Sequence, residues 1–196
     1  MVSKTREKLI DVAKQLFVKN GIENTTMNDI ANASDKGRRT IYTYFKNKRD
    51  IYNAVIERES ERLVTNLREI AMSRHTPTEK LRLFLEHRLA LSSDNRQDTL
   101  RSFFSFEYKR IGRVRRLASA KVNEILNLIT AEGVADGSFD REQAGRLLPL
   151  ISAVLHGIYA MQLHENADDH HGDEQSSSRD IISFIIEGIK RPNPAY

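Results

Sequence analysis

Residues 25–48 read TTMNDIANASDKGRRTIYTYFKNK, and this stretch decides how the fold is interpreted. Thr26 is followed three residues later by Asp29, and this capping-box spacing predicts the start of a short helix. The buried side of that helix consists of the apolar residues Met27, Ile30 and Ala31. The next segment, Ser34-Asp35-Lys36-Gly37, has the composition of a turn, and its glycine can adopt the backbone angles that a sharp corner needs.

A second helix is predicted from Arg38 to Phe45. Ile41 and Phe45 are four residues apart, so they share one face of this helix. Arg38, Arg39 and Thr43 point away from that face. Two helices joined by so short a turn form a helix-turn-helix, and the second helix of that motif fits the major groove of DNA, which is roughly 12 Å wide. The stretch therefore predicts a DNA-binding domain, called the head below, in which the second helix contacts the bases and is called the reading helix.

The composition is that of an ordinary globular protein. Of the 196 residues, 39% are hydrophobic and 30% are charged, and none is cysteine, which excludes a disulfide framework and thiolate zinc sites. The chain has no apolar run of about 18 residues, and charges interrupt its first segment, so we expect no membrane span, no signal peptide and a cytoplasmic location. Residues 1–52 hold eleven Lys and Arg against six Asp and Glu, which is the pattern of a domain that neutralises phosphates.

Helical periodicity continues along the chain, and no segment has the alternation of a strand. Helices are predicted over residues 4–20 with a left-handed cap at Gly21, over 46–72, 78–91 and 98–109, after Lys121, from about Asp140 with a kink at Pro149, and over 179–190. A mobile loop is expected at residues 166–178. We therefore predict an all-α fold of about nine helices, with a DNA-binding domain at residues 1–50 and a ligand-binding and dimerisation domain at residues 51–196.

The last two predicted helices carry apolar residues around much of their circumference, more than a monomer would leave exposed to water. We expect these helices to pair with their copies in a second subunit as a four-helix bundle, which makes the protein a homodimer. The two-fold axis then relates two reading heads. They must lie about 34–36 Å apart to enter successive major grooves of a palindromic operator.

Residues 5–55 resemble the TetR family of bacterial transcriptional repressors. The resemblance rests on Leu16-Phe17, Gly21-Ile22, Thr25-Thr26, Ile30-Ala31, Thr40-Ile41-Tyr42, Tyr44-Phe45 and Lys46-Asn47-Lys48, which match in spacing without gaps. It implies the same dimeric arrangement, and it implies that Lys48 grips the phosphate backbone. Family members usually read Ala-Gly-Val-Ser in the turn, where this chain has Ser34-Asp35-Lys36-Gly37, so the entry to the reading helix is expected to differ in detail.

The residues predicted to contact DNA lie on and around the reading helix. An arginine in its first turn can bond guanine O6 and N7, which is worth about 1–3 kcal/mol of discrimination, and hydroxyl groups suit phosphate oxygens. The full set is Thr25, Thr26, Lys36, Gly37, Arg38, Arg39, Thr40, Tyr42, Thr43, Tyr44 and Lys48. Other interpretations stay open: a solvated basic corner for the arginines, a core ring for Tyr42 or Tyr44, and a plain helix cap for Thr26.

The second domain is expected to enclose a small-molecule pocket between its helices. The candidates are aromatic, apolar or singly polar residues on inward faces, namely Phe84, His87, Phe103, Phe104, Tyr108, Leu126, Ile129, His156 and Tyr159, and core packing explains the same residues. The acidic, His-rich run at 168–174 has a metal-binding composition, but a solvated loop is favoured and no metal site is predicted. Residues 109–121 hold six Lys and Arg without an acid, and a solvated face is favoured there too.

These features favour a dimeric repressor that a small molecule releases from DNA. An enzyme is disfavoured because the sequence has no phosphate loop, nucleophile elbow or HExxH motif, so no catalytic residue and no cofactor is predicted beyond an unidentified effector. A DNA-binding factor without a small-molecule effector, regulated by a protein partner or by its abundance, fits the sequence as well. A body without a cavity would favour that alternative.

Overall fold

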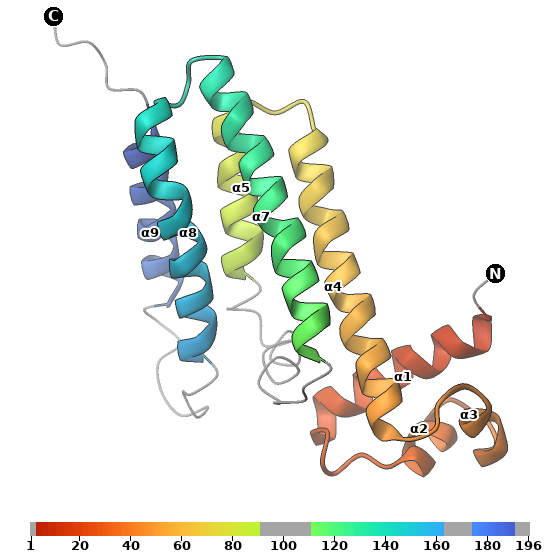
Figure 1. The fold of residues 1–196 in the computed structure, drawn as a ribbon. Coiled ribbons are helices and arrows are strands. Elements are labelled where there is room, and N and C mark those ends of the chain that lie inside the picture. The colour runs from red at the N-terminus through yellow and green to blue at the C-terminus, as the bar shows by residue number, and fades with distance from the viewer. Residues whose placement is uncertain (1–2, 91–110, 163–173, 191–196) are drawn as a thin grey trace, which may run out of the picture. The chain divides into compact units, whose positions relative to one another are not determined.

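The computed structural model describes residues 3–90, 111–162 and 174–190. These residues form helices throughout, and the one β feature among them is an isolated bridge between Phe139 and Lys190 (Figure 1). The all-α prediction is therefore confirmed. The chain forms two compact units. The head contains the chain up to Arg62 and the first turns of α7 up to Arg116, and the body begins at Leu63 and takes up α7 again from Leu117.

The head is built on three helices and the start of a fourth: α1 (Lys4–Asn20), α2 (Met27–Ala33), α3 (Arg38–Tyr44) and α4 (Lys48–Met72). The predicted limits of α1 and the predicted capping box of Thr26 and Asp29 are confirmed. The core of the head collects the buried apolar residues Leu9, Ile10, Ala13, Phe17, Ile22, Met27, Ile30, Ala31, Ile41, Phe45, Ile51, Tyr52, Ala54, Val55 and Ile56. This core fixes α3 through Ile41, so the remaining faces of α3 are free to carry polar groups.

The turn between α2 and α3 corrects one expectation. Gly37 is the N-cap of α3 with φ −64° and ψ 149°, which any residue can adopt, and the positive φ of the turn falls on Asp35 at 54°. Aspartate is among the residues that tolerate this left-handed region. At the end of α1, Gly21 has φ 78° and ψ 159°, a combination that is close to glycine-only. The predicted left-handed cap is therefore correct in the sign of φ, but its ψ lies outside the left-handed helical region.

The body contains the second part of α4 together with α5 (Pro77–Ala90), α7 (Ile111–Ala135) from Leu117 onward, α8 (Arg141–Gln162) and α9 (Glu174–Ile189). The axes of these helices are roughly aligned in Figure 1, with the chain direction alternating from one helix to the next, and α9 packs against both α5 and α8. The shared core is formed by Leu67, Ala71, Leu81, Phe84, Leu85, Leu89, Val122, Ile125, Leu126, Ile129, Phe139, Ala144, Ile151, Leu155, Ile182, Ile185, Ile186 and Ile189.

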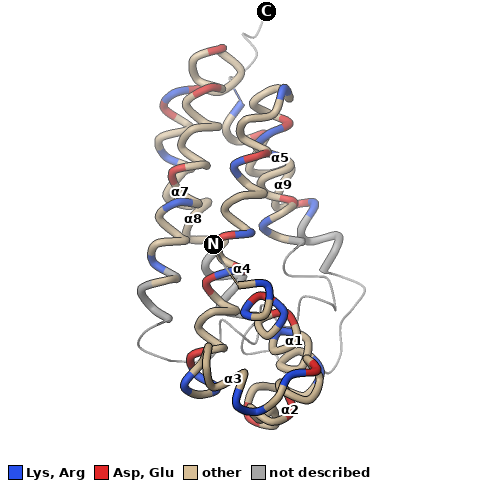
Figure 2. Tube along the Cα trace, turned by 90° about the vertical axis from the view of Figure 1, so that its right-hand side faces the viewer, with Lys and Arg blue, Asp and Glu red and all other residues tan. Residues whose placement is uncertain are grey.

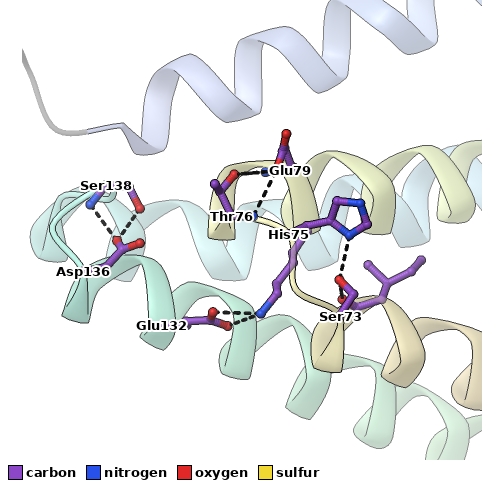
Figure 3. A network of polar contacts seen from close by, with 9 residues as sticks. Ser73, His75, Thr76, Glu79, Glu132, Asp136 and Ser138 are labelled. Atoms are coloured by element: carbon purple, nitrogen blue, oxygen red, sulfur yellow. Dashed lines mark hydrogen bonds and ion pairs between the residues drawn. The ribbon is translucent and has the colours of Figure 1, made fainter.

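Polar contacts organise the end of the body where α4 turns into α5 (Figure 3). Thr76 and Glu79 form a capping interaction like that of α2, because the Glu79 carboxylate accepts from the Thr76 amide and hydroxyl at 3.0 Å each. Lys80 is buried, and its ammonium lies 2.8 Å from both carboxylate oxygens of Glu132 on α7. This ion pair ties the first turn of α5 to the last turns of α7.

Three predicted helix limits were wrong. α7 begins at Ile111 rather than after Lys121, so most of the basic segment 109–121 is helical. α9 begins at Glu174 rather than at 179, so the last five residues of the predicted loop are helical. Serine and charged residues without an apolar stripe hid the start of α9. At the start of α7, Ile111, Val114 and Leu117 do have helical spacing, and the basic residues between them drew attention away from it. α4 begins at Lys48 rather than at 46. The predicted helix at 98–109 and the loop segment 166–173 lie outside the described residues.

Candidate nucleic-acid interface

The outward face of α3 presents two arginines in its first turn. Arg38 and Arg39 are exposed, and within the described part of the chain neither forms an ion pair with a carboxylate. The Arg38 guanidinium lies 5.9 Å from the centroid of the Tyr42 ring, so the two side chains form a cation–π pair one turn apart. Tyr42 is 44% exposed, which excludes the core-ring interpretation for this tyrosine. The pair leaves guanidinium N–H groups directed at solvent on the face that the core does not use.

The second half of α3 carries hydroxyl groups with local partners. Thr43 is exposed, and its Oγ1 donates to the Arg39 carbonyl at 3.0 Å. Thr40 is half-buried at the start of the helix. Tyr44 is half-buried against the head core, and its hydroxyl lies 3.0 Å from the Ser3 hydroxyl. Tyr44 therefore combines the two interpretations that the sequence left open, a ring in the core and a hydroxyl at the surface.

At the start of α2 the two threonines have different surroundings. Thr26 is exposed and caps the helix: its amide and hydroxyl donate to Asp29 at 2.8 and 2.7 Å, and its hydroxyl accepts from the Asp29 amide at 3.2 Å. The bonds from the Thr26 hydroxyl and amide lower the pKa of Asp29. Thr25 is fully buried, and its hydroxyl donates to the Gly21 carbonyl at 2.8 Å. Its side chain thus holds the loop, and a contact of Thr25 with DNA stays a prediction.

Lys48 has partners that the sequence did not indicate. Its ammonium donates to the carbonyls of Ile22 and Glu23 at 2.6 and 3.0 Å, so it fastens the loop between α1 and α2 to the start of α4. An ammonium has three donors, and two are used here. The predicted grip of Lys48 on phosphate remains a prediction, with one donor left for it. In the turn before α3, Lys36 is half-buried and Gly37 is exposed.

Two residues near the amino terminus join this surface, and the sequence analysis missed both. Ser3 occupies the N-cap position of α1 but makes no capping bond with its side chain, which contacts Tyr44 instead. The Arg6 guanidinium lies 5.4 Å from the centroid of the Phe45 ring. Contacts across about forty residues leave no local signal, so only the folded chain brings them together.

Ion pairs between α1 and α4 hold the head as one block. Arg58 lies 2.7 Å from Asp11, and Lys14 lies 2.8 Å from the buried carboxylate of Glu59. Because Glu59 is only 6% exposed, its charge requires the lysine as partner. These ion pairs fasten α1 to α4, and both helices share the head core with α3.

Three of the predicted ligand-binding residues lie together in one core. Phe84, Leu126 and Ile129 are buried in the core of the body, as the packing interpretation expected. His87 is half-buried, and burial, with the nearby charge of Arg88 as a smaller cause, lowers its pKa. Phe103, Phe104 and Tyr108 lie outside the described residues, as does the stretch 168–173, and the side chains of His156 and Tyr159 on α8 are not described either.

The described residues contain no group of three or more His, Asp or Glu side chains that could hold a metal ion. None of the described helices is long and apolar enough to cross a membrane. Along the trace of the head, Lys and Arg positions outnumber Asp and Glu positions (Figure 2), in keeping with the eleven against six in residues 1–52. The geometry therefore defines a helix-turn-helix protein with a basic head.

Comparison with known proteins points to one family. Residues 9–55 match the family model described as bacterial regulatory proteins, tetR family. An HTH-type transcriptional regulator of Staphylococcus aureus is 32% identical over 91 residues, which cover 46% of this chain and 49% of the relative, so the match spans about half the length of the curated relative. Among solved structures, a TetR/AcrR-family regulator from Thermobifida fusca has a TM-score of 0.73 at 22% identity, covering 96% of this chain and 100% of that one.

A transcriptional regulator from Cytophaga hutchinsonii has the same fold, with a TM-score of 0.77 at 21% identity, covering 94% of this chain and 98% of that one. At this identity the likeness concerns the fold alone. The family model covers the helix-turn-helix, and the fold continues over nearly the whole chain. Over residues 9–55 the head is therefore similar to the TetR family of bacterial regulatory proteins.

Proposed function

We propose that the protein is a dimeric, sequence-specific DNA-binding transcriptional regulator of the cytoplasm, and that it is a repressor released by a small molecule bound in the body. The observation that carries the DNA-binding part is the exposed arginines Arg38 and Arg39 in the first turn of α3. Neither forms an ion pair with a carboxylate in the described part of the chain, and the head core holds α3 through its opposite face. First-turn arginines reach guanine edges, and α3 fits a major groove. The remaining predicted contacts are Thr25, Thr26, Lys36, Gly37, Thr40, Tyr42, Thr43, Tyr44 and Lys48.

Dimerisation is supported by the outer faces of α8 and α9. Three large apolar side chains are exposed there: Leu150 at 57%, Val154 at 42% and Phe184 at 76%. Leu150 and Val154 are four residues apart, so they share one face of α8. Exposed apolar groups on neighbouring packed helices are suited to burial against a second copy of the same surface, as in a four-helix bundle.

Regulation by a small molecule is the finer part of the proposal. Two structural neighbours are named as a ketosteroid transcriptional regulator and as the repressor of a multidrug efflux pump, which supports an effector without identifying one. An effector that separates the two heads needs a coupling free energy of typically about 1–3 kcal/mol, and about 5.5 kcal/mol for nearly complete switching. The alternative is a DNA-binding factor without an effector, regulated by a protein partner or by abundance.

A salt-titrated binding experiment tests the proposal. The full chain is used to select duplexes from a random pool, and affinity is then measured on a selected and a scrambled duplex at several salt concentrations. Arg39→Ala should lose about 5- to 150-fold on the selected duplex and much less on the scrambled one, because a base contact is worth about 1–3 kcal/mol. Arg62→Ala is the matched control, since Arg62 is exposed on α4 about 21 Å from its first residue. If no duplex is enriched, the proposed function is wrong.

A further inference from the structure

The first turn of α1 is attached to the end of α3 by two side-chain contacts. The Ser3 hydroxyl lies 3.0 Å from the Tyr44 hydroxyl, and the Arg6 guanidinium lies 5.4 Å from the centroid of the Phe45 ring. Tyr44 and Phe45 are the last residue and the C-cap of α3. Lys4 and Thr5 lie between Ser3 and Arg6, so these two contacts hold the backbone of the turn that carries Lys4.

Lys4 is exposed, and no carboxylate in the described part of the chain pairs with it. It is adjacent to Ser3, and consecutive Cα atoms are about 3.8 Å apart, so its backbone lies within about one Debye length of the Tyr44 hydroxyl, roughly 8–10 Å at physiological salt. The Lys4 side chain therefore starts close enough for its ammonium to reach a phosphate that meets the end of α3, at a distance where salt does not screen the attraction completely.

We propose that the first turn of α1 is a phosphate-binding element of the DNA interface, in which Lys4 supplies the charge and Ser3 and Arg6 hold it beside the end of α3. This inference rests on the proposed function and adds one contact to the proposed DNA interface. Its occupant is a backbone phosphate of duplex DNA next to the bases that α3 reads. The contact adds affinity without sequence choice, because phosphates carry no base information.

The Ser3 hydroxyl has a second role in this arrangement. A hydroxyl has one donor and two acceptor sites, so when Ser3 donates to the Tyr44 oxygen, the Tyr44 proton is available to a phosphate oxygen. Hydrogen bonds in a chain strengthen one another. Ser3 is therefore a positioning residue that acts through Tyr44 and through the neighbouring Lys4.

Lys8 provides the matched control. It is exposed like Lys4, it carries the same charge, and at four residues further along α1 it lies on the same face, about 6 Å farther along the axis from Ser3. If the charge acts only through the general field of the head, the two lysines have equal effects. If Lys4 binds a phosphate, its effect is larger.

The test compares full-length wild type with Lys4→Ala, Lys8→Ala and Lys4→Arg on the selected and scrambled duplexes. Lys4→Ala should make the slope of log affinity against log salt shallower by about 0.9 and weaken both duplexes by the same factor, because one phosphate contact is lost. Lys8→Ala should change the slope by less than half as much, and Lys4→Arg should restore it. Equal slopes for Lys4→Ala and Lys8→Ala, or for Lys4→Ala and wild type, would overturn the inference while the proposed function stands.

The positioning role is tested by a double-mutant cycle. In the Ser3→Ala background, Lys4→Ala should change the slope by less than half of its effect in wild type, because the lysine is no longer held in place. Additive effects would overturn the role of Ser3. Thermal unfolding of each variant establishes that the head is folded, and absence of duplex binding by wild type would instead overturn the proposed function and this inference with it.

Discussion

The head and the body each contain a helix that starts with the same capping interaction, but their exposed side chains differ in chemistry. Thr26 with Asp29 caps α2 in the head, and Thr76 with Glu79 caps α5 in the body, through the same bonds from threonine amide and hydroxyl to carboxylate. Around this shared device the head exposes arginines on α3, whereas the body exposes leucine, valine and phenylalanine on α8 and α9. Capping bonds between near neighbours thus start helices in both units. The side chains that each core leaves exposed indicate what that unit binds: DNA for the head and a second subunit for the body.

The two cores differ in how far they reach along the chain. The head core runs from Leu9 to Ile56, so its residues are close in sequence, whereas the body core collects residues from Leu67 to Ile189 on five helices. A core built from near neighbours can be recognised from spacing alone. A core built from distant helices depends on which apolar faces pack together. Hydrophobic periodicity identifies the apolar face of each helix but not the helix against which it packs.

The strongest test of the comparison removes an anchor of the head core. Ile41 is fully buried in α3, so Ile41→Ala should lower the free energy of unfolding by about 2–5 kcal/mol and abolish DNA binding. Dimerisation through α8 and α9 should persist. Chemical denaturation followed by circular dichroism measures stability, light scattering measures the dimer, and duplex binding is measured alongside. Val18→Ala, at an exposed apolar position of α1 outside the predicted DNA contacts, serves as control. Loss of the dimer in Ile41→Ala would show that the two surfaces are not separate.

A second test reverses the chemistry of the body surface. Phe184→Glu places a charge where we propose an apolar interface, and it should weaken dimerisation by at least about 2 kcal/mol, roughly 30-fold. Sedimentation over a range of concentrations measures this effect. Leu128→Glu is the control, because Leu128 on α7 is also exposed, at 47%, but lies outside the proposed interface. Equal weakening by both variants would contradict the assignment of the interface to α8 and α9.

A smaller effect is expected from the ion pair of Lys80 and Glu132. Glu132→Gln leaves the buried ammonium without a counter-charge, which costs about 3–5 kcal/mol when both partners are buried. Because Glu132 is 46% exposed, solvent screens the pair and we expect about 1–2 kcal/mol in urea denaturation. Glu142→Gln, in the exposed pair with Arg146, should change stability by less than about 0.5 kcal/mol. Similar losses in the two variants would show that burial of Lys80 does not matter.

The smallest effect concerns pH and the two capping carboxylates. Bonds from Thr26 lower the pKa of Asp29, and bonds from the Thr76 amide and hydroxyl lower the pKa of Glu79. A pKa that is lower in the folded state gives stability that is present above the unfolded value, near pH 4, and is lost as pH falls through the folded value. Asp29→Asn and Glu79→Gln should therefore differ from wild type in melting temperature at about pH 6 and converge with it towards about pH 2. A constant difference at all pH values would contradict this linkage.

Much of the candidate site could be predicted because its signals are local. The spacing of Thr26 and Asp29 predicted the start of α2. The four-residue spacing of Ile41 and Phe45 predicted the buried face of α3, and therefore also the exposed face that carries its arginines. Gly37 was expected to supply the backbone angles of the turn, but the positive φ falls on Asp35, because composition predicts a turn without fixing the position of its special residue. The predicted ligand-binding residues have no comparable local signal, because residues on the inward face of a helix can belong either to the packed core or to a pocket.

The all-α fold, the helix-turn-helix and the positive charge of the head could be read from local patterns in the chain. The bonds from the Lys48 ammonium to the loop carbonyls of Ile22 and Glu23, and the contact of the Ser3 hydroxyl with Tyr44, became visible only in the folded molecule. The physical reason is that helix caps and apolar stripes arise from residues within a few positions of one another. Contacts between residues that are 25 to 41 positions apart exist only after packing has brought the helices together.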